Sequence, residues 1–141
     1  MAIDERLTAA IDRYEVAIDA LMNGDPGPYT DCWSRTDDVT LYGAWGPVDK
    51  GFPTVVETLR WVASRSIGGV KVELTALVES GDFAYTVGLE HHNISVDGGP
   101  THEMILRVTQ IYRRSDGEWQ VVHRHADILP EDQRKARPSA T

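Results

Sequence analysis

The chain has 141 residues, 41% of them apolar, and carries 22 acidic against 14 basic residues for a formal net charge of −8. A chain of this length can bury roughly two thirds of its unfolded surface in one domain, without a cofactor or disulfide. The negative charge repels nucleic acid and anionic membranes, and no basic stripe with interleaved aromatic residues offsets it. No apolar run approaches the ~18 residues of a membrane span, and the single Cys32 cannot form an internal disulfide. We therefore expect a cytoplasmic protein that binds neither nucleic acid nor membrane.

The N-terminal half has helical periodicity. Between Asp4 and Met22 apolar residues recur at spacings of four and three, which predicts a helix with one buried face; they are Leu7, Ile11, Tyr14, Ile18 and Leu21. A short second helix is expected over residues 28–34 and a strand over residues 39–43. A third helix is expected to begin near Pro53 and to end before Gly68.

After Gly69 the pattern changes to the period of two that is typical of strands. Four long strands are predicted, over residues 70–79, 83–96, 101–114 and 118–128, and the short turns between them make the sheet antiparallel. Helices followed by a run of strands indicate an α+β architecture, with helices packed on one face of a curved sheet. We expect a single domain over residues 1–129 and a mobile, charged C-terminal tail over residues 130–141.

The turn lengths predict which residues share a face of the sheet. With a four-residue loop at Asp97–Pro100 and a three-residue loop at Ser115–Gly117, Glu90 faces Arg107, and Arg107 faces His125. The opposite face is more apolar, so the helices should cover it; it carries Tyr85, Val87, Leu89, His91, Leu106, Val108, Gln110, Tyr112, Val122, Arg124 and Ala126.

The covered face has the composition of a ligand pocket. The polar side chains of His91, Gln110, Tyr112 and Arg124 stand among apolar neighbours, which is the pattern of a hydrophobic cavity with a few convergent polar groups. Trp45 shares strand parity with Leu41 and could line this cavity or close its mouth. A buried Arg124 must find a carboxylate, phosphate or carbonyl, and that partner is either a protein residue or a ligand.

The outer row of Glu90, Arg107 and His125 has two interpretations, as an acid–base chain or as cross-strand ion pairs. We favour the structural one. Apolar Ile111, Trp119 and Val121 are expected on the same face, where a homodimer partner would cover them. His123 and His125 have the spacing of a metal pair, but no third ligand has recognisable spacing, so we expect no metal.

Several short motifs together resemble those of a known superfamily. They are Arg13-Tyr14 and Asn23-Gly24-Asp25 around the first helix, the entry Asp37-Asp38-Val39-Thr40, the strand start Phe83-Ala84-Tyr85, and the ending from Asp116 to His125. In this order they resemble the nuclear transport factor 2-like superfamily, most closely its SnoaL-like branch, from about Asp4 to Asp127. The resemblance implies a cone-shaped α+β barrel with an interior pocket, usually in a homodimer that packs sheet against sheet.

Ketosteroid isomerase belongs to the same superfamily and uses an Asp base with a Tyr and a protonated Asp as oxyanion hole. Its helical Tyr matches Tyr14, whereas its base falls at about Gly43 and its second acid near Gln110. Gln110 is also similar in position to a pocket Arg of the calcium/calmodulin-dependent kinase association domain. The resemblance implies either an isomerase, cyclase or dehydratase without a cofactor, acting on a small hydrophobic molecule through Tyr14, His91, Gln110 and Arg124, or a non-catalytic ligand-binding or scaffold domain.

Overall fold

Three helices and six strands make up the computed structural model, which describes residues 2–130. In chain order they are α1 (Glu5–Met22), α2 (Gly27–Asp31), β1 (Thr40–Tyr42), β2 (Val48–Lys50), α3 (Phe52–Arg65), β3 (Ser66–Ser80), β4 (Phe83–Val96), β5 (His102–Ser115) and β6 (Glu118–Ile128). All the predicted helices and strands are present, and β2 is an additional one. Of the predicted tail, only Pro130 lies within the described residues.

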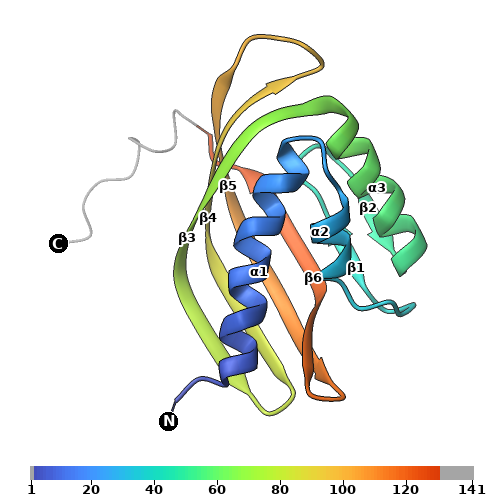
Figure 1. Ribbon diagram of the computed structural model, residues 1–141, viewed down its shortest axis with the longest axis vertical. Helices are drawn as coiled ribbons and strands as arrows, with labels where there is room; N and C mark the ends of the chain where they lie inside the picture. The colour runs from blue at the N-terminus through green and yellow to red at the C-terminus, as the bar shows by residue number, and fades with distance from the viewer. Residues whose placement is uncertain (1, 131–141) are drawn as a thin grey trace, which may run out of the picture.

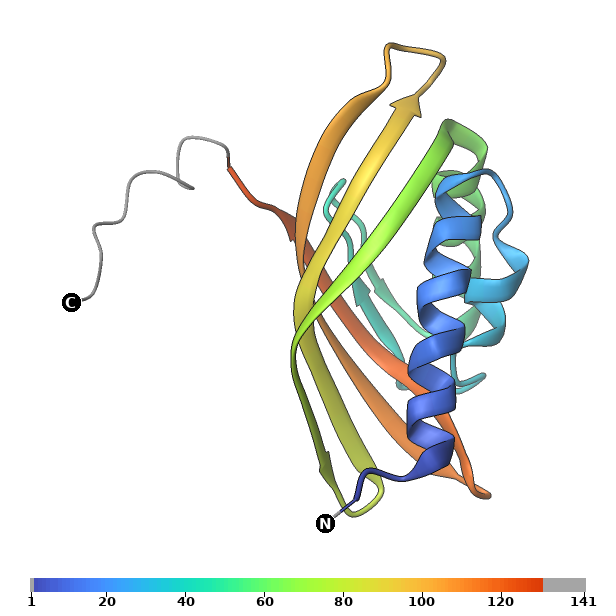
Figure 2. The same cartoon turned by 60° about the vertical axis from the view of Figure 1, so that its left-hand side comes forward.

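The six strands form one curved sheet in the order β2-β1-β6-β5-β4-β3. Neighbours are antiparallel except β1 and β6, which run parallel, so the sheet is mixed rather than antiparallel throughout. All three helices lie on its concave side, with α1 running along the opening (Figures 1 and 2). The predicted α+β fold is confirmed, as an open cone rather than a closed barrel.

Helix α1 closes the cone with the apolar stripe that its sequence predicts. Leu7, Ile11, Tyr14, Ile18 and Leu21 are all at most 5% exposed. The Asp4 side chain caps the helix by accepting a hydrogen bond from the Arg6 backbone amide at 2.9 Å. It also accepts one from the Trp119 indole at 3.0 Å, which ties the start of α1 to β6.

The predicted pairing of β4 with β5 is wrong by one residue. The last pair before the turn is Ile94 with His102, and residues 97–101 form a loop one residue longer than expected, so Glu90 faces Leu106 instead of Arg107. Because successive side chains of a strand point to opposite faces, this shift turns every side chain of β4 over. Glu90 and His92 therefore point into the cone, and His91 points out of it.

The pairing of β5 with β6 also differs near the turn. Asp116 and Gly117 form a two-residue turn with φ of 53° and 78°, and a bulge opposite Ile111 and Tyr112 then restores the predicted parity. Trp119 and Val121, which were expected on the outer face, are consequently buried. Beyond the bulge Gln110, Arg124 and Ala126 point into the cone, as predicted.

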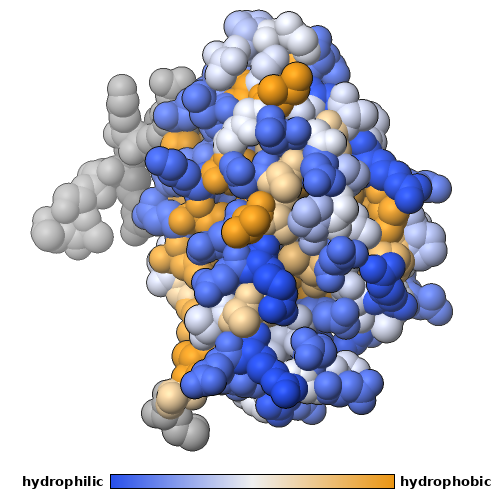
Figure 3. All heavy atoms as spheres, in the orientation of Figure 1, coloured by the Kyte–Doolittle hydropathy of each residue, from blue (hydrophilic) through white to orange (hydrophobic). Residues whose placement is uncertain are grey.

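The helix side of the molecule is largely hydrophilic, with apolar residues along the margin where β3 runs and in a patch on the opposite side, near α3 (Figure 3). Within residues 2–130, no helix combines the length and the apolar character that a membrane crossing requires.

Candidate functional site

A fully buried carboxylate on β4 organises the interior of the cone. Glu90 accepts hydrogen bonds from Arg124 Nη1 and Nη2, each at 2.8 Å, in a bidentate pair between β4 and β6. The Tyr14 hydroxyl of α1 donates to the same carboxylate, and His92 Nε2 lies 2.9 Å from Glu90 Oε1. These four bonds use all the acceptor positions of the carboxylate, so Glu90 is an anchor and not a free base.

The charges in this cluster stabilise one another. Burial alone would raise the pKa of Glu90, but the positive charge and hydrogen bonds of Arg124, with the bond to His92, hold that pKa far below its usual range. Burial likewise disfavours the charged guanidinium, and the charge of Glu90 outweighs it and raises the pKa of Arg124. Burial and the charge of Glu90 raise the pKa of Tyr14 well above its ordinary value, so its hydroxyl keeps the proton that it donates.

A second set of hydrogen bonds connects Arg124 with uncharged side chains of β5 and α2. Arg124 Nη1 donates to Gln110 Oε1 at 3.3 Å, and the Tyr29 hydroxyl of α2 donates to the same oxygen. Gln110 Nε2 donates to the Tyr112 hydroxyl at 2.9 Å. Tyr14, Tyr29, Gln110 and Tyr112 are each at most 2% exposed. The network thus joins α1 and α2 to three strands of the sheet.

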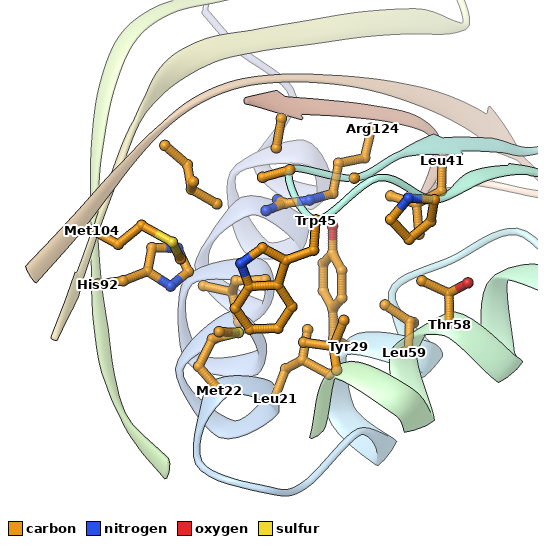
Figure 4. Close-up of a pocket in the computed structure, with 17 residues that line it drawn as sticks. Leu21, Met22, Tyr29, Leu41, Trp45, Thr58, Leu59, His92, Met104 and Arg124 are labelled. Atoms are coloured by element: carbon orange, nitrogen blue, oxygen red, sulfur yellow. The ribbon is translucent and has the colours of Figure 1, made fainter. Parts of the chain in front are cut away.

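A cavity of about 60 Å³ lies beside this network, between the sheet, the helices and the turn that joins β1 to β2. Most of its wall is apolar, and Arg124, His92, Tyr29 and Thr58 supply polar groups (Figure 4). The residues around it are Ile18, Leu21, Met22, Tyr29, Leu41, Gly43, Ala44, Trp45, Pro47, Thr58, Leu59, Val62, His92, Met104, Leu106, Arg124 and Ala126. The Thr58 hydroxyl is bound to Asp49 at 2.5 Å.

The predicted pocket residues divide into three groups. Trp45 and Arg124 line the cavity. The Trp45 ring packs edge-on against the Trp61 ring, with 6.1 Å between the ring centroids. Tyr14 and Gln110 lie behind the wall, in the network that holds Arg124. Tyr112 and Val122 are buried and are not among the residues around the cavity.

Four predicted pocket residues are misplaced, because the predicted register of β4 was wrong. Tyr85, Val87, Leu89 and His91 lie on the convex face, where Tyr85 is 42% exposed and His91 pairs with Glu73 at 2.9 Å. Their places on the concave face are taken by Ala84, Thr86, Gly88, Glu90 and His92.

The predicted outer row does not form either. Glu90 is inside the cone, and Arg107 instead pairs with Asp127 of β6 at 2.7 and 2.8 Å. His125 faces Thr109, and His123 Nδ1 lies 2.7 Å from the Thr40 hydroxyl. The Tyr42 ring contacts both histidines edge-on. No cluster of three or more metal-ligating side chains occurs within residues 2–130.

His92 and Tyr29 are among the cavity residues that were not predicted from the sequence. The predicted register places His92 on the outer face with Glu90, because residues two apart on a strand share a face. Tyr29 lies in a five-residue helix whose short length gives no periodic signal.

Comparison with known proteins places the chain in a family. The sequence profile of the SnoaL-like domain matches residues 9–129. A ketosteroid isomerase-like protein from Erwinia carotovora atroseptica has a similar structure, with a TM-score of 0.77, 19% identity, and coverage of 91% of this chain and 99% of the other. A nuclear transport factor 2-like superfamily protein from Salmonella enterica has a TM-score of 0.74 and 16% identity, with coverage of 95% of this chain and 96% of the other.

A dehydratase candidate of the same superfamily, from Streptomyces avermitilis, gives a TM-score of 0.69 at 20% identity, with coverage of 89% of this chain and 95% of the other. At these identities the structural likeness shows the fold alone. Comparison with curated proteins gave no match. The profile match spans most of the chain, and the chain therefore belongs to the SnoaL-like domain family.

Proposed function

We propose that the cavity binds a small, largely apolar ring compound, and that the protein acts on it by proton transfer, as an isomerase, cyclase or dehydratase without a cofactor. The observation that carries the proposal is an apolar wall interrupted by a few fixed polar side chains. A volume of about 60 Å³ restricts the ligand to a small compound. The names of two structural neighbours, one ketosteroid isomerase-like and one a dehydratase candidate, agree with this class of reaction.

Arg124 supports the binding of a neutral polar group. Its bonds to Glu90 and Gln110 use three of its four Nη hydrogens, which leaves one hydrogen on Nη2 for a ligand carbonyl or hydroxyl oxygen. Because Glu90 already balances the charge of the guanidinium, an anionic ligand would gain little from it. We therefore favour a ligand with a carbonyl or hydroxyl group over a carboxylate or phosphate.

A non-catalytic ligand-binding domain is the second candidate, and Gly43 favours it. The acidic base of ketosteroid isomerase would fall at about this residue, which lines the cavity here without a side chain. The two candidates differ in whether a bound carbon acid exchanges its hydrogens.

Ring compounds are expected to bind in the cavity, and their affinity should fall when a larger side chain occupies it. We would titrate cyclic enones and small aromatic compounds and follow the amide shifts of cavity residues. Ala126→Leu adds three carbons to the cavity wall and should weaken binding at least tenfold, because about 1.4 kcal/mol of contact is enough for that factor. Thr109→Val on the convex face is the control and should leave binding unchanged.

The same samples in D₂O test catalysis. Deuterium should replace the hydrogens next to the carbonyl of bound cyclic enones faster than in buffer, and Ala126→Leu should slow this exchange. Equal binding by the wild-type protein and Ala126→Leu would contradict the pocket assignment. Binding without exchange would leave the ligand-binding domain as the function.

We also propose that the convex face of the sheet pairs with a second copy of the chain. This face exposes apolar side chains on neighbouring strands, among them Val78, Tyr85 and Val87 at 40%, 42% and 36%. Sedimentation equilibrium at micromolar concentration should give twice the mass of the chain. The double change Tyr85→Asp and Val87→Asp should give a monomer, whereas Val16→Asp, at a 72% exposed position of α1, should not. A monomeric wild-type protein would contradict this proposal.

A further inference from the structure

His92 has one ring nitrogen without a partner, although the residue is only 1% exposed. Its side chain projects from β4 beside Met104 and lines the cavity (Figure 4). Nε2 contacts Glu90 Oε1 at 2.9 Å, whereas Nδ1 makes no hydrogen bond to any residue between 2 and 130. Leaving a buried polar atom unpaired is unfavourable, so a donor on a ligand in the cavity would be a favourable partner for this nitrogen.

The contact with Glu90 determines which nitrogen carries the proton. The pKa of Glu90 lies far below its usual range because Arg124 and the other donors outweigh the effect of burial, so the carboxylate is ionised and can only accept. Nε2 must therefore be the N–H donor. In the neutral ring, Nδ1 is then left with a lone pair and acts as an acceptor.

Among the side chains of the wall, His92 Nδ1 is the basic acceptor, because the hydroxyl oxygens of Tyr29 and Thr58 can accept a hydrogen bond but are only weakly basic. The Tyr29 hydroxyl donates to Gln110, the Thr58 hydroxyl donates to Asp49, and Arg124 has only donors. Glu90 itself is fully engaged by Arg124, Tyr14 and His92. Nδ1 is thus the basic nitrogen among the side chains that line the cavity, and its ring is held in place by a carboxylate that is itself bound by Arg124 and Tyr14.

We propose that His92 Nδ1 is the proton acceptor of this cavity and that it recognises a ligand by a hydroxyl group. This rests on the proposed pocket function and deepens it to neutral ring compounds that carry a hydroxyl donor. In the reaction, the O–H bond of an enol ligand breaks, its proton moves to Nδ1, and its electron pair forms a carbonyl while the electrons of the adjacent double bond shift to carbon. The same proton then returns to another atom of the ligand, which isomerises it, or joins a departing hydroxide to give water.

The imidazolium formed in that step keeps its Nε2–H bond to Glu90. A carboxylate in this position fixes the tautomer and stabilises the cation, as the Asp of a serine protease triad does for its His. Glu90 is therefore a positioning residue, and His92 is the group that touches the ligand.

Phenol and toluene form a matched pair of probes, because a hydroxyl replaces a methyl group of similar size. In long-range ¹H–¹⁵N spectra of the wild-type protein, phenol should shift His92 Nδ1 toward the hydrogen-bonded position, and toluene should not. His92→Gln keeps a donor toward Glu90 and removes the acceptor at Nδ1. This variant should lower the affinity for phenol about tenfold and leave the affinity for toluene within about a factor of two of the wild-type value.

The outcomes separate the two proposals. Two results would overturn the assignment of His92 and leave the pocket in place, provided that toluene binds. One is that phenol does not shift the Nδ1 resonance. The other is that His92→Gln lowers the affinity for phenol no more than the affinity for toluene. If neither compound shifts a cavity residue, the pocket function fails and this inference fails with it. Loss of deuterium exchange in His92→Gln, by about 10²-fold or more with toluene binding retained, would support the proton-transfer role.

Discussion

Glu90→Leu is expected to lower the free energy of unfolding by about 3–5 kcal/mol, because it leaves the Arg124 charge buried without a counter-charge. Glu90 is 0% and Arg124 6% exposed, so water cannot take the place of the lost carboxylate. The Tyr14 hydroxyl and His92 Nε2 lose their acceptor as well. Urea denaturation, followed by circular dichroism at constant pH, measures the change.

The double variant Glu90→Leu with Arg124→Met distinguishes a buried charge from a general loss of packing. It removes both charges and keeps side-chain volume, so it should recover most of the stability that the single change loses. Arg107→Ala is the exposed control. Its partner Asp127 has a side chain 49% exposed, and breaking that pair should cost under about 1 kcal/mol. A single variant Glu90→Leu as stable as the wild type would contradict the proposed role of the carboxylate.

The same variants test the pH dependence of stability. The pKa of Glu90 is lower in the folded protein than its ordinary value of 4.5. Its contribution is therefore fully present above that value and is lost as the pH falls toward the folded pKa. Below about pH 5 the wild-type protein should lose stability more steeply than the double variant, which has no carboxylate at this position.

The parts of the fold that the sequence predicted well are those with a repeated signal. The stripe of α1 repeats over about four turns, and the strands β4 and β5 each alternate over most of their fourteen residues. Turn lengths carry no such redundancy. A loop at residues 97–101 that is one residue longer than expected placed Glu90 and His92 on the wrong face in the prediction, and with them the carboxylate that Arg124 requires.

Arg124 was identified correctly as the residue whose burial needs an explanation, since a buried guanidinium demands a partner whatever the register. Its partner could not be predicted, because that depends on the absolute pairing of β4 with β5. Side-chain chemistry thus predicted that a partner exists, and only the backbone pairing identified Glu90 among the carboxylates of the chain.

β3 approaches β4 closely beside a bulge, and Gly88 permits this approach. Gly88 faces Leu74, next to the bulge between Leu74 and Ala76 on β3, and lies two residues before Glu90 on the same face. A Cβ at this position would overlap the Glu73 carbonyl oxygen and lie 3.0 Å from Leu74 Cα, and both are backbone atoms. The residue is not among those with positive φ, so the obstacle to a side chain is steric.

Gly88→Ala is therefore expected to cost about 3 kcal/mol, at the upper end of overpacking effects, because two strands must separate to admit one methyl group. Since Glu90 and His92 follow on the same strand, their amide resonances should shift even where the variant remains folded. Gly27→Ala is the matched control, because its nearest obstacle is the Asp25 side chain at 3.3 Å and alanine favours the helix that begins there. That variant should lie within about 1 kcal/mol of the wild type. If Gly88→Ala were equally well tolerated, β3 could move away from β4 at little cost, and the position of Glu90 and His92 would not depend on this close approach.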